Sequence, residues 1–447
     1  MHTLEQLRSG QLAGVRRLDL SCGLTEFPPE IFTLADSLEV LNLTGNALTS
    51  LPDDLPRLHR LQVLFCSSNR FTDLPVSIGP CPQLHTVGFK ANQIHRLDAA
   101  ALPASSLRAL ILTDNHLTEV PAELGRCSRL LKLMLSGNRL STLPAELSHC
   151  RSLELLRLAA NRFTALPGWL LQMPRLAWLA CGGNPFSDPA QAPAEADRGE
   201  VLIDWQALSL QGVLGEGTSG VIHRALYQPP GHTGDAQPVA VKLFKGKMTS
   251  DGLPHSEMAA CLRAGGHPNL IGALGRLQGH PEGPLGLVMP LVDPAYRVLA
   301  GPPSLDSCTR DVHDAAAAPL SVAVVRRMAL GVARAVAHLH ARGILHGDLY
   351  AHNILWHGQG EVLLGDFGAA ALMPLADPAA CEGLQRTEVL AWACLLAELL
   401  ARADQATSPP VLVSGLMALQ QACSVDDPAQ RPLFDDIAHR LEALAAE

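Results

Sequence analysis

The chain has 447 residues, 47% of them hydrophobic and 17% charged, so it can bury large cores and is not disordered by composition. The net charge of −9 comes from the second half, because residues 1–190 carry 17 basic and 16 acidic side chains and residues 191–447 carry 17 and 27. This balance excludes an extended basic surface for nucleic acid, and the longest apolar run, Val389 to Ala397, is too short to cross a bilayer.

Cysteine usage and the first residues of the chain indicate the compartment. The eleven cysteines are odd in number and include no C-x-x-C pair, which argues against a disulfide framework and against a zinc site. The N-terminal residues MHTLEQLRSG lack the apolar core of a signal peptide. We therefore expect a soluble, cytoplasmic protein with no membrane span.

The first part of the chain is a repeat with a period of 23 residues. One asparagine marks each copy, at Asn46, Asn69, Asn92, Asn115, Asn138, Asn161 and Asn184. Leucines at fixed offsets around it can fill a continuous core that no single copy could bury, and the asparagine amide can pair with backbone groups at the turn. This frame is the leucine-rich repeat pattern. It predicts an α/β solenoid over residues 1–186, with about eight repeats and a cap at each end.

Strand alternation predicts which side chains line the concave face of this solenoid. The third and fifth positions of each frame point to that face and form a mostly apolar stripe. It includes Val40, Val63, Phe65, Ile111, Met134, Leu155 and Trp178. A contiguous exposed apolar patch usually marks an interaction surface, so we expect it to bind a protein partner or substrate. The alternative is that this face rests against the second half of the same chain.

The repeats end in a stretch rich in Pro, Ala and charge, and residues 187–204 are predicted to be a linker. The glycines that follow, Gly215, Gly217 and Gly220, have β-type residues on both sides, which favours a hairpin whose backbone N–H groups approach phosphates closely. Further on, Lys242 ends an apolar V-A-V-K strand, and Glu257 lies fifteen residues beyond it.

The richest group of reactive residue types lies between Ile344 and Gly368. Asp348 and Asn353 are five residues apart, and Asp366 opens an Asp-Phe-Gly triplet thirteen residues after the asparagine. Phosphoryl transfer from Mg-ATP requires one carboxylate to orient and deprotonate the acceptor hydroxyl. It also requires an amide and a second carboxylate to hold Mg²⁺ on the phosphates.

The order and spacing of these motifs resemble the protein kinase family over residues 205–447. The resemblance implies a two-lobed α+β domain, with an N-lobe at 205–290 and a C-lobe at 291–447, that binds ATP and Mg²⁺. It implies that Asp348 is the catalytic base, that Glu257 holds Lys242 on the phosphates, and that Asn353 and Asp366 bind the metal. The nucleotide contacts that it implies are Gly215, Glu216, Gly217, Gly220, Val221, Ala240, Lys242, the gatekeeper Met289 and the hinge residue Val292.

The sequence departs from this family beside the catalytic aspartate. Gly347 replaces the arginine that normally receives a phosphate from the activation loop, and residues 366–386 contain no Ser, Thr or Tyr. Together these two features indicate that phosphorylation of that segment does not switch activity, so any gate comes from the repeats or from a partner. The segment is also short and lacks Ala-Pro-Glu, which leaves open how a peptide substrate would dock.

Two further departures concern the charge near the transferred phosphate. Tyr350 stands where serine/threonine kinases carry a lysine, and His352 stands where tyrosine kinases place an arginine. A cationic His352 could assist transfer. The alternative is that His352 is an ordinary loop residue.

Three functions remain open at this point. An active protein kinase, with serine/threonine specificity expected from the family, explains why all five polar positions of the motif set are filled, since unpaired buried charges are costly. A small-molecule kinase is the second, because His-Gly-Asp and the short segment also resemble antibiotic-phosphorylating kinases. The third is a pseudokinase scaffold that binds proteins through the repeats. The overall plan resembles soluble leucine-rich repeat protein kinases.

Overall fold

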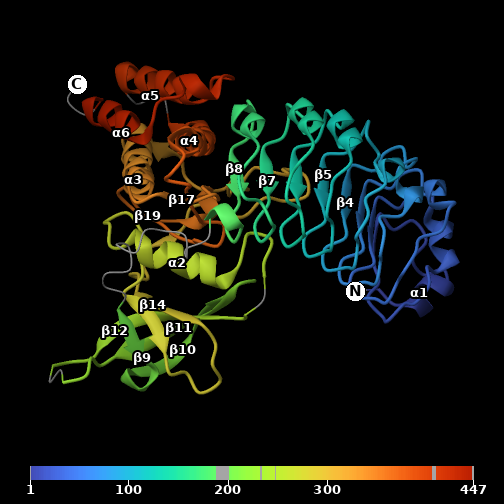
Figure 1. Ribbon diagram of the computed structural model, residues 1–447, viewed down its shortest axis with the longest axis horizontal. Helices are drawn as coiled ribbons and strands as arrows, with labels where there is room; N and C mark the ends of the chain where they lie inside the picture. Colours follow the sequence, from blue (N-terminus) through green and yellow to red (C-terminus); the bar gives the residue numbers. More distant parts are fainter. Residues whose placement is uncertain (1, 188–200, 232–233, 247, 405–408, 445–447) are drawn as a thin grey trace. The chain divides into compact units, whose positions relative to one another are not determined.

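The computed structural model describes residues 2–187, 201–231, 234–246, 248–404 and 409–444 (Figure 1). The chain forms two compact units, residues 1–176 and residues 177–447. Most of the predicted linker, residues 188–200, lies outside the described residues. The predicted domain limits at residues 186 and 204 therefore stay a prediction. Among the described residues, no helix combines the length and the apolar character that crossing a membrane requires.

The first unit is a solenoid of short parallel strands, as the 23-residue period predicts. It begins with the capping helix α1 (Leu4–Arg8). The strands are β1 (Arg17–Asp19), β2 (Val40–Asn42), β3 (Val63–Phe65), β4 (Thr86–Gly88), β5 (Ala109–Ile111), β6 (Lys132–Met134) and β7 (Leu155–Arg157). Each pairs with the next in register, so that Leu18 lies opposite Leu41 and Leu41 opposite Leu64. The repeat period thus matches the strand register, and the central aliphatic residue of each strand, a leucine in all but β4, lies opposite its counterpart in the next.

The outer side of the solenoid consists of 3-10 helices. They are η1 (Pro29–Leu34), η2 (Leu55–Arg57), η3 (Val76–Ile78), η4 (Ala99–Ala101), η5 (Ala122–Arg126), η6 (Ala145–His149) and η7 (Gly168–Gln172). Most of them follow a proline whose ring fixes φ, for example at −66° for Pro121 and −65° for Pro144. A proline therefore sets the point at which most of these 3-10 helices begin, while η2 and η4 follow Asp54 and Asp98.

Buried asparagines connect successive repeats, which confirms their predicted role. Asn115 is 3% exposed. Its Oδ1 accepts a hydrogen bond of 2.9 Å from the backbone N–H of Ile94, and its Nδ2 donates to the carbonyl oxygens of Phe89 at 2.9 Å and Leu112 at 3.1 Å. The same three partners recur one period later at Asn138. Each amide therefore satisfies backbone groups of two repeats that would otherwise be buried without a partner.

The predicted apolar stripe on the strands is less exposed than expected. Val40, Phe65 and Ile111 are half-buried. The other four positions are buried: Val63, Met134, Leu155 and Trp178. Neighbouring strands crowd one another, since a Cβ added at Gly88 would lie 2.5 Å from Cδ1 of Phe65. The prediction that the whole stripe is exposed is wrong.

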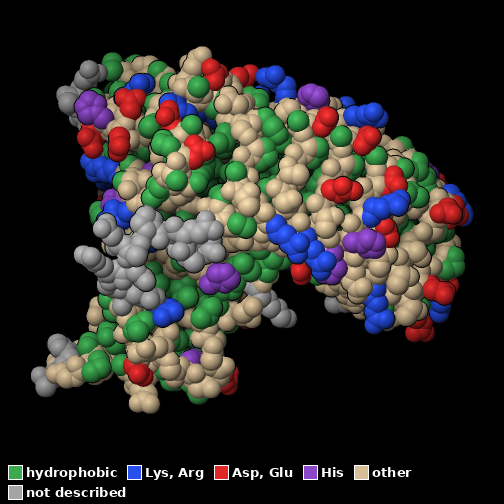
Figure 2. Space-filling model, in the orientation of Figure 1, with side chains coloured by type: hydrophobic (Ala, Val, Ile, Leu, Met, Phe, Trp, Pro, Cys, Tyr) green, Lys and Arg blue, Asp and Glu red, His purple; other side chains and the backbone are tan. Residues whose placement is uncertain are grey.

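Charged side chains of the repeats are mixed in sign, in keeping with their nearly neutral balance. On the face in Figure 2, acidic and basic residues are interspersed over the repeats. Several form exposed ion pairs, such as Arg16 with Glu39 at 2.6 Å and Arg57 with Asp54 at 2.7 Å. Exposed pairs of this kind stabilise a fold by only about 0–1 kcal/mol, so their main effect is on solubility.

The second unit begins with the strand of the last repeat, β8 (Trp178–Ala180), and η8 (Pro185–Ser187). A six-stranded sheet follows, with helix α2 (Pro254–Ala264) beside it. In spatial order its strands are β10 (Leu208–Glu216), β11 (Gly220–Tyr227), β12 (Gln237–Phe244), β14 (Gly286–Pro290), β13 (Gly275–Gln278) and β9 (Leu202–Asp204). Between β9 and β10 lies η11 (Trp205–Ala207).

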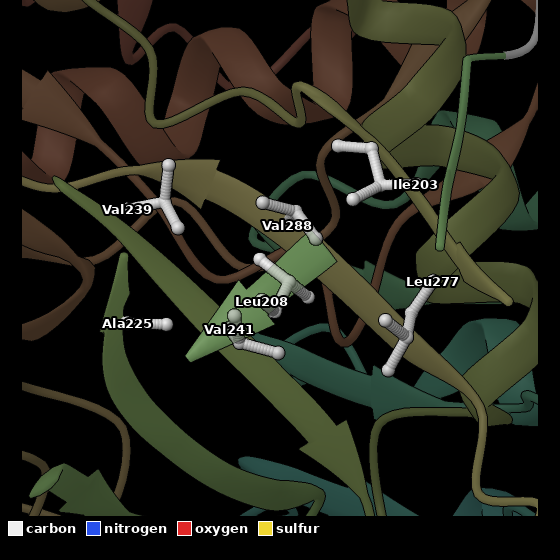
Figure 3. Packing of buried hydrophobic residues seen from close by; sticks show 7 residues of the cluster. All are labelled: Ile203, Leu208, Ala225, Val239, Val241, Leu277 and Val288. Atoms are coloured by element: carbon white, nitrogen blue, oxygen red, sulfur yellow. The ribbon is translucent and has the colours of Figure 1, made fainter. Parts of the chain in front are cut away.

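The core of this sheet consists of aliphatic side chains from five of its strands and from the start of β10 (Figure 3). Its members are Ile203, Leu208, Ala225, Val239, Val241, Leu277 and Val288. Val239 and Val241 alternate with residues that face the other side of β12, among them Lys242. The hydrophobic side of β12 therefore fixes the direction in which Lys242 points.

The rest of the second unit is mainly helical. Its helices are α3 (Val322–Ala341), α4 (Pro378–Ala401), α5 (Pro410–Cys423) and α6 (Phe434–Ala443), with the 3-10 turns η12 (Ala351–Asn353) and η13 (Pro428–Gln430). Short strands pair between them: β15 (Arg297–Val298) with β18 (Ile354–His357) and β19 (Glu361–Leu364), β16 (Leu320–Ser321) with β21 (Ala403–Asp404), and β17 (Ile344–Leu345) with β20 (Ala371–Leu372). The buried indole of Trp392 donates to the carbonyl oxygen of Ala329 at 3.1 Å and so fixes α4 on α3.

We expect replacement of a buried repeat asparagine to destabilise the protein selectively. Asn115→Ala leaves one N–H and three carbonyl groups, those of Phe89, Leu112 and Thr113, without the amide. The expected cost is about 1–3 kcal/mol in the free energy of unfolding. Thr118→Ala changes an exposed residue of the same repeat and is the control. Urea unfolding of both variants measures the difference. Equal midpoints for the two variants would show that the amide does not stabilise the repeats.

Candidate active site

Lys242 and Glu257 form a buried ion pair between β12 and α2. Nζ of Lys242 donates to Oε1 of Glu257, and the two side chains are only 11% and 6% exposed. Burial raises the pKa of Glu257, the charge and hydrogen bond of Lys242 oppose that rise, and the nearby carboxylates of Asp366 and Asp251 add to it. Removing either partner would leave a buried charge uncompensated, so the pair is held together by its surroundings.

The glycine-rich turn closes the hairpin between β10 and β11. The N–H of Gly217 donates to the carbonyl oxygen of Gly220 at 2.9 Å. Nζ of Lys245 donates to Oε1 of Glu216 at 2.7 Å and to the carbonyl oxygen of Gly217 at 2.9 Å. A Cβ added at Gly215 or Gly217 would meet no atom within 4 Å, whereas one at Gly220 would lie 2.5 Å from the carbonyl oxygen of Leu243. Packing therefore requires glycine only at Gly220, and the first two leave open backbone that a phosphate can approach.

The remaining predicted nucleotide contacts lie along the neighbouring strands. Val221 is half-buried on β11, and Ala240 of β12 pairs with Met289 of β14. Met289 is 9% exposed, and Val292 follows the end of β14 as a half-buried residue. These residues could contact an adenine ring at the end of the sheet that also carries Lys242.

The loop after β17 holds Asp348 by hydrogen bonds from its own asparagine. Nδ2 of Asn353 donates to the carbonyl oxygen of Asp348 and to its Oδ2, each at 2.9 Å. The fully buried ring of His346 donates from Nε2 to the carbonyl oxygen of Gly365 at 2.9 Å. Asp348 itself is half-buried, so its carboxylate is fixed but can still be reached.

Asp366 lies in the turn that connects this loop to the next segment. Its φ of +53° is in the left-handed region that non-glycine residues seldom adopt, and such strain is often found at functional sites. Its Oδ1 accepts from the N–H of Gly368 at 3.0 Å, and its side chain is exposed, whereas Phe367 is buried. A Cβ at Gly368 would lie 3.0 Å from Oδ1 of Asp366 and 3.9 Å from Oε2 of Glu257, so the two predicted motifs meet here.

The donor set of this region suits a magnesium–nucleotide complex. Asn353 and Asp366 offer the amide and carboxylate oxygens that Mg²⁺ prefers, and Lys242 supplies a positive charge for phosphate. The exposed carboxylate of Asp366 and the open glycine backbone are both available to a ligand.

Glu388 of α4 is hydrogen-bonded to the loop that carries Asp348. Its Oε1 accepts from the N–H of Gly347 at 2.5 Å, and its Oε2 accepts from Nε2 of His340 at 2.7 Å. Burial alone would raise the pKa of Glu388. The hydrogen bond and charge of His340, the charge of His346 and the N–H of Gly347 outweigh burial and lower it. The Glu388 carboxylate therefore stays ionised in the interior.

The helix that carries Glu388 begins well before that residue, at Pro378. Asp377 caps α4 by accepting from the N–H of Ala380 at 3.1 Å, and Pro378 occupies its first turn. Proline has no N–H to lose at that position, so Asp-Pro is a strong start signal. Only β20 and a short turn therefore separate Gly368 from the helix.

The partner of His352 was not identified from the sequence. Nδ1 of the His352 ring lies 2.7 Å from Oδ1 of Asp311, and the backbone N–H of His352 donates to Oδ2 of Asp311 at 3.0 Å. Burial lowers the pKa of His352, but the hydrogen bond and charge of Asp311, with the charges of Asp348 and Asp366, raise it overall. Asp311 lies 41 residues earlier, between β15 and β16, and no local pattern indicates the pairing.

Strand alternation predicts that Trp178 lies on an exposed face, but the structure buries it. It is 1% exposed because its indole stacks on the ring of Tyr350, with centroids 4.3 Å apart and planes inclined by 8°. Both residues belong to the second unit. The tyrosine that replaces the family's lysine is thus covered by the strand of the last repeat.

Comparison with known proteins agrees with both halves of the chain. The model of the protein tyrosine and serine/threonine kinase family matches residues 208–395, and leucine-rich repeat models match residues 105–163 and 37–58. Kinase suppressor of Ras A from Caenorhabditis elegans is 29% identical over 192 residues, which are 41% of this chain and 22% of that protein.

Two further relatives are kinases by name. The non-receptor tyrosine-protein kinase TNK1 from Homo sapiens is 28% identical over 41% of this chain and 26% of its own length. The putative cyclin-dependent kinase F-2 from Oryza sativa subsp. japonica is 29% identical over 43% of this chain and 61% of its own length. The chain thus spans between 22% and 61% of these three relatives. It carries leucine-rich repeats followed by a domain of the protein tyrosine and serine/threonine kinase family.

Proposed function

We propose that this protein is an ATP-dependent protein kinase that transfers the γ-phosphate of Mg-ATP to a hydroxyl group of a protein substrate. The buried Lys242–Glu257 pair beside Asp366 is the observation that carries this proposal. A fold that never binds a nucleotide gains nothing from burying this pair, because apolar residues of the same volume would cost less. Kinase relatives of both the serine/threonine and the tyrosine type support the class, and we expect serine or threonine as the acceptor.

Each residue then has a defined task in the transfer. Asp348 orients the acceptor hydroxyl and takes its proton as the oxygen bonds to the γ-phosphorus and the bond to the β-phosphate oxygen breaks, with ADP as the leaving group. Asn353 and Asp366 would hold Mg²⁺, and the ion would supply positive charge to the phosphates. Lys242 binds the α- and β-phosphates, and His352, when protonated, supplies positive charge on the acceptor side.

The repeats supply the protein-binding surface in this proposal. Leucine-rich repeats commonly bind proteins, and Val40, Phe65 and Ile111 remain half-buried on the strand face. We infer that a protein partner or substrate binds at this part of the stripe. Trp178 takes no part in that binding, because it is covered within the second unit.

A small-molecule acceptor is the second candidate, and one observation favours it. Helix α4 begins at Pro378, so the segment after Gly368 is too short to form an extended platform for a peptide. A hydroxylated small molecule would need no such platform. The two candidates share the same catalytic residues and differ only in the acceptor.

Loss of the catalytic carboxylate should abolish transfer. Asp348→Asn keeps the size of the side chain but cannot take a proton, so the rate should fall by about 10²–10⁴. Asp314→Asn, in an exposed turn, is the matched control. Transfer of labelled γ-phosphate to the protein itself, to basic generic proteins and to hydroxylated small molecules measures the rate. Transfer to small molecules alone would favour a small-molecule kinase. ATP binding without any transfer would contradict both kinase functions and favour a pseudokinase scaffold.

The ion pair of His352 with Asp311 should make stability depend on pH in a defined direction. The pKa of His352 is raised above its ordinary value of 6.5, so the stabilisation is fully present below about pH 6.5 and is lost as pH rises through the folded value. The difference in unfolding free energy between the parent and His352→Gln should therefore shrink from pH 6 toward pH 9. His357→Gln, on an exposed part of β18, is the control, and a difference that grew with pH would contradict the assignment.

A further inference from the structure

The strand of the last repeat contacts the catalytic loop directly. Within the second unit, Nε1 of Trp178 donates a hydrogen bond of 3.0 Å to the carbonyl oxygen of Leu349, the residue after Asp348. The indole also stacks on Tyr350, the next residue along the chain. Trp178 and Tyr350 are 1% and 4% exposed. One buried side chain of the repeat therefore fixes both the backbone and a ring of the loop that carries the proposed base.

The segment between β15 and β16 (residues 299–319), called the insertion below, contributes further side chains around this contact. The guanidinium carbon of Arg310 lies 4.9 Å from the centre of the Trp178 ring, and the rings of Tyr350 and His352 are 5.0 Å apart. Asp311, the neighbour of Arg310, holds His352 through its ring and its N–H. Residues 349–352 are thus enclosed between the last repeat on one side and the insertion on the other.

The backbone of β8 occupies the space beside Gly347. At this residue φ is +77°, and an added Cβ would lie 2.6 Å from the carbonyl oxygen of Ala369 and 2.8 Å from that of Leu179. A Cβ at Gly182 would likewise lie 2.7 Å from the carbonyl oxygen of Ala370. The last repeat therefore packs against the loop and against the segment after Asp-Phe-Gly, and no side chain fits at Gly347.

This packing accounts for two departures of the sequence together. An arginine at residue 347, the position that resembles a phosphate receiver, would collide with β8, and the segment from 366 to 386 offers no residue to phosphorylate. The packing of β8 on Gly347 is a permanent contact, and it can hold the loop where a phosphorylated segment would otherwise have to do so.

We propose that Trp178 is a positioning residue of the phosphotransfer site, through which the terminal leucine-rich repeat holds the catalytic loop in its working geometry. The inference rests on the proposed kinase function. Trp178 touches neither nucleotide nor acceptor and acts through Leu349 and Tyr350 on Asp348. The strand of the terminal repeat is then a required part of the catalytic unit, and activity does not depend on phosphorylation of residues 366–386.

Substitution of Trp178 in the full-length chain tests the proposal. Trp178→Ala should raise amide hydrogen exchange in residues 346–353 by about tenfold or more, because both the hydrogen bond and the stacked ring are lost. It should lower kcat by about 10- to 100-fold and leave KM for ATP within about twofold, since misplacement of the base affects transfer more than nucleotide binding. Trp178→Phe keeps a ring without the N–H and should show a smaller change of the same kind.

Trp169→Ala is the matched control, because Trp169 lies in η7 of the first unit. It should change neither the exchange of residues 346–353 nor kcat. Unchanged exchange and unchanged kcat in Trp178→Ala would overturn the proposal, as would equal effects of the two tryptophan substitutions. If Trp178→Ala does not fold, Trp178→Phe takes its place, and unchanged amide hydrogen exchange of residues 346–353 in that variant overturns the proposal.

A second variant tests the same contact from the side of the loop. Gly347→Arg should displace β8 and raise amide hydrogen exchange in residues 177–182, while exchange in β6 stays unchanged. Equal exchange of residues 177–182 in Gly347→Arg and in the parent would count against the packing of β8 on Gly347. The exchange measurement also separates this proposal from the proposed function. If the parent transfers no phosphate, the kinase assignment fails, and the exchange of residues 346–353 in Trp178→Ala still shows whether the repeat positions the loop.

Discussion

A buried carboxylate, that of Glu388, is the constraint on which the catalytic loop depends. It accepts the N–H of Gly347 on one oxygen and His340 on the other, and it stays ionised because these donors and the charge of His346 outweigh burial. An unpaired carboxylate at this depth would cost several kcal/mol, so the loop and α3 cannot move away from α4 independently. The orientation of Asp348 follows from the backbone that this carboxylate fixes.

The repeat half of the structure was predictable because its determinants are local and periodic. At the central strand position an aliphatic residue, usually leucine, meets its counterpart 23 residues away, and the Asn115 amide bonds to backbone groups of its own repeat and the preceding one. Such contacts are encoded by one short frame.

The exposure of the strand face was not predictable in the same way, because Phe65 covers Gly88 and Trp178 is covered by a loop 171 residues later in the chain.

The site shows the same division between local and distant determinants. Spacing within motifs indicated Asp348, Asn353 and Asp366; the structure hydrogen-bonds Asn353 to Asp348 and brings Asp366 near the Lys242–Glu257 pair. Asp311 had no local signal, since it lies in an irregular stretch and meets His352 only through the fold. The start of α4 did have a local signal, the Asp377-Pro378 cap.

Gly347 shows how a departure from a family pattern can be a positive feature of the fold. Its left-handed φ excludes most side chains, and the carbonyl oxygens of Leu179 and Ala369 exclude any Cβ. Glycine is therefore required by the close approach of three backbone segments, one of which comes from the last repeat. Because the residue that resembles a regulatory arginine is missing for this steric reason, its absence does not by itself indicate an inactive kinase. It is the sequence change expected when a repeat, rather than a phosphate, supports the loop.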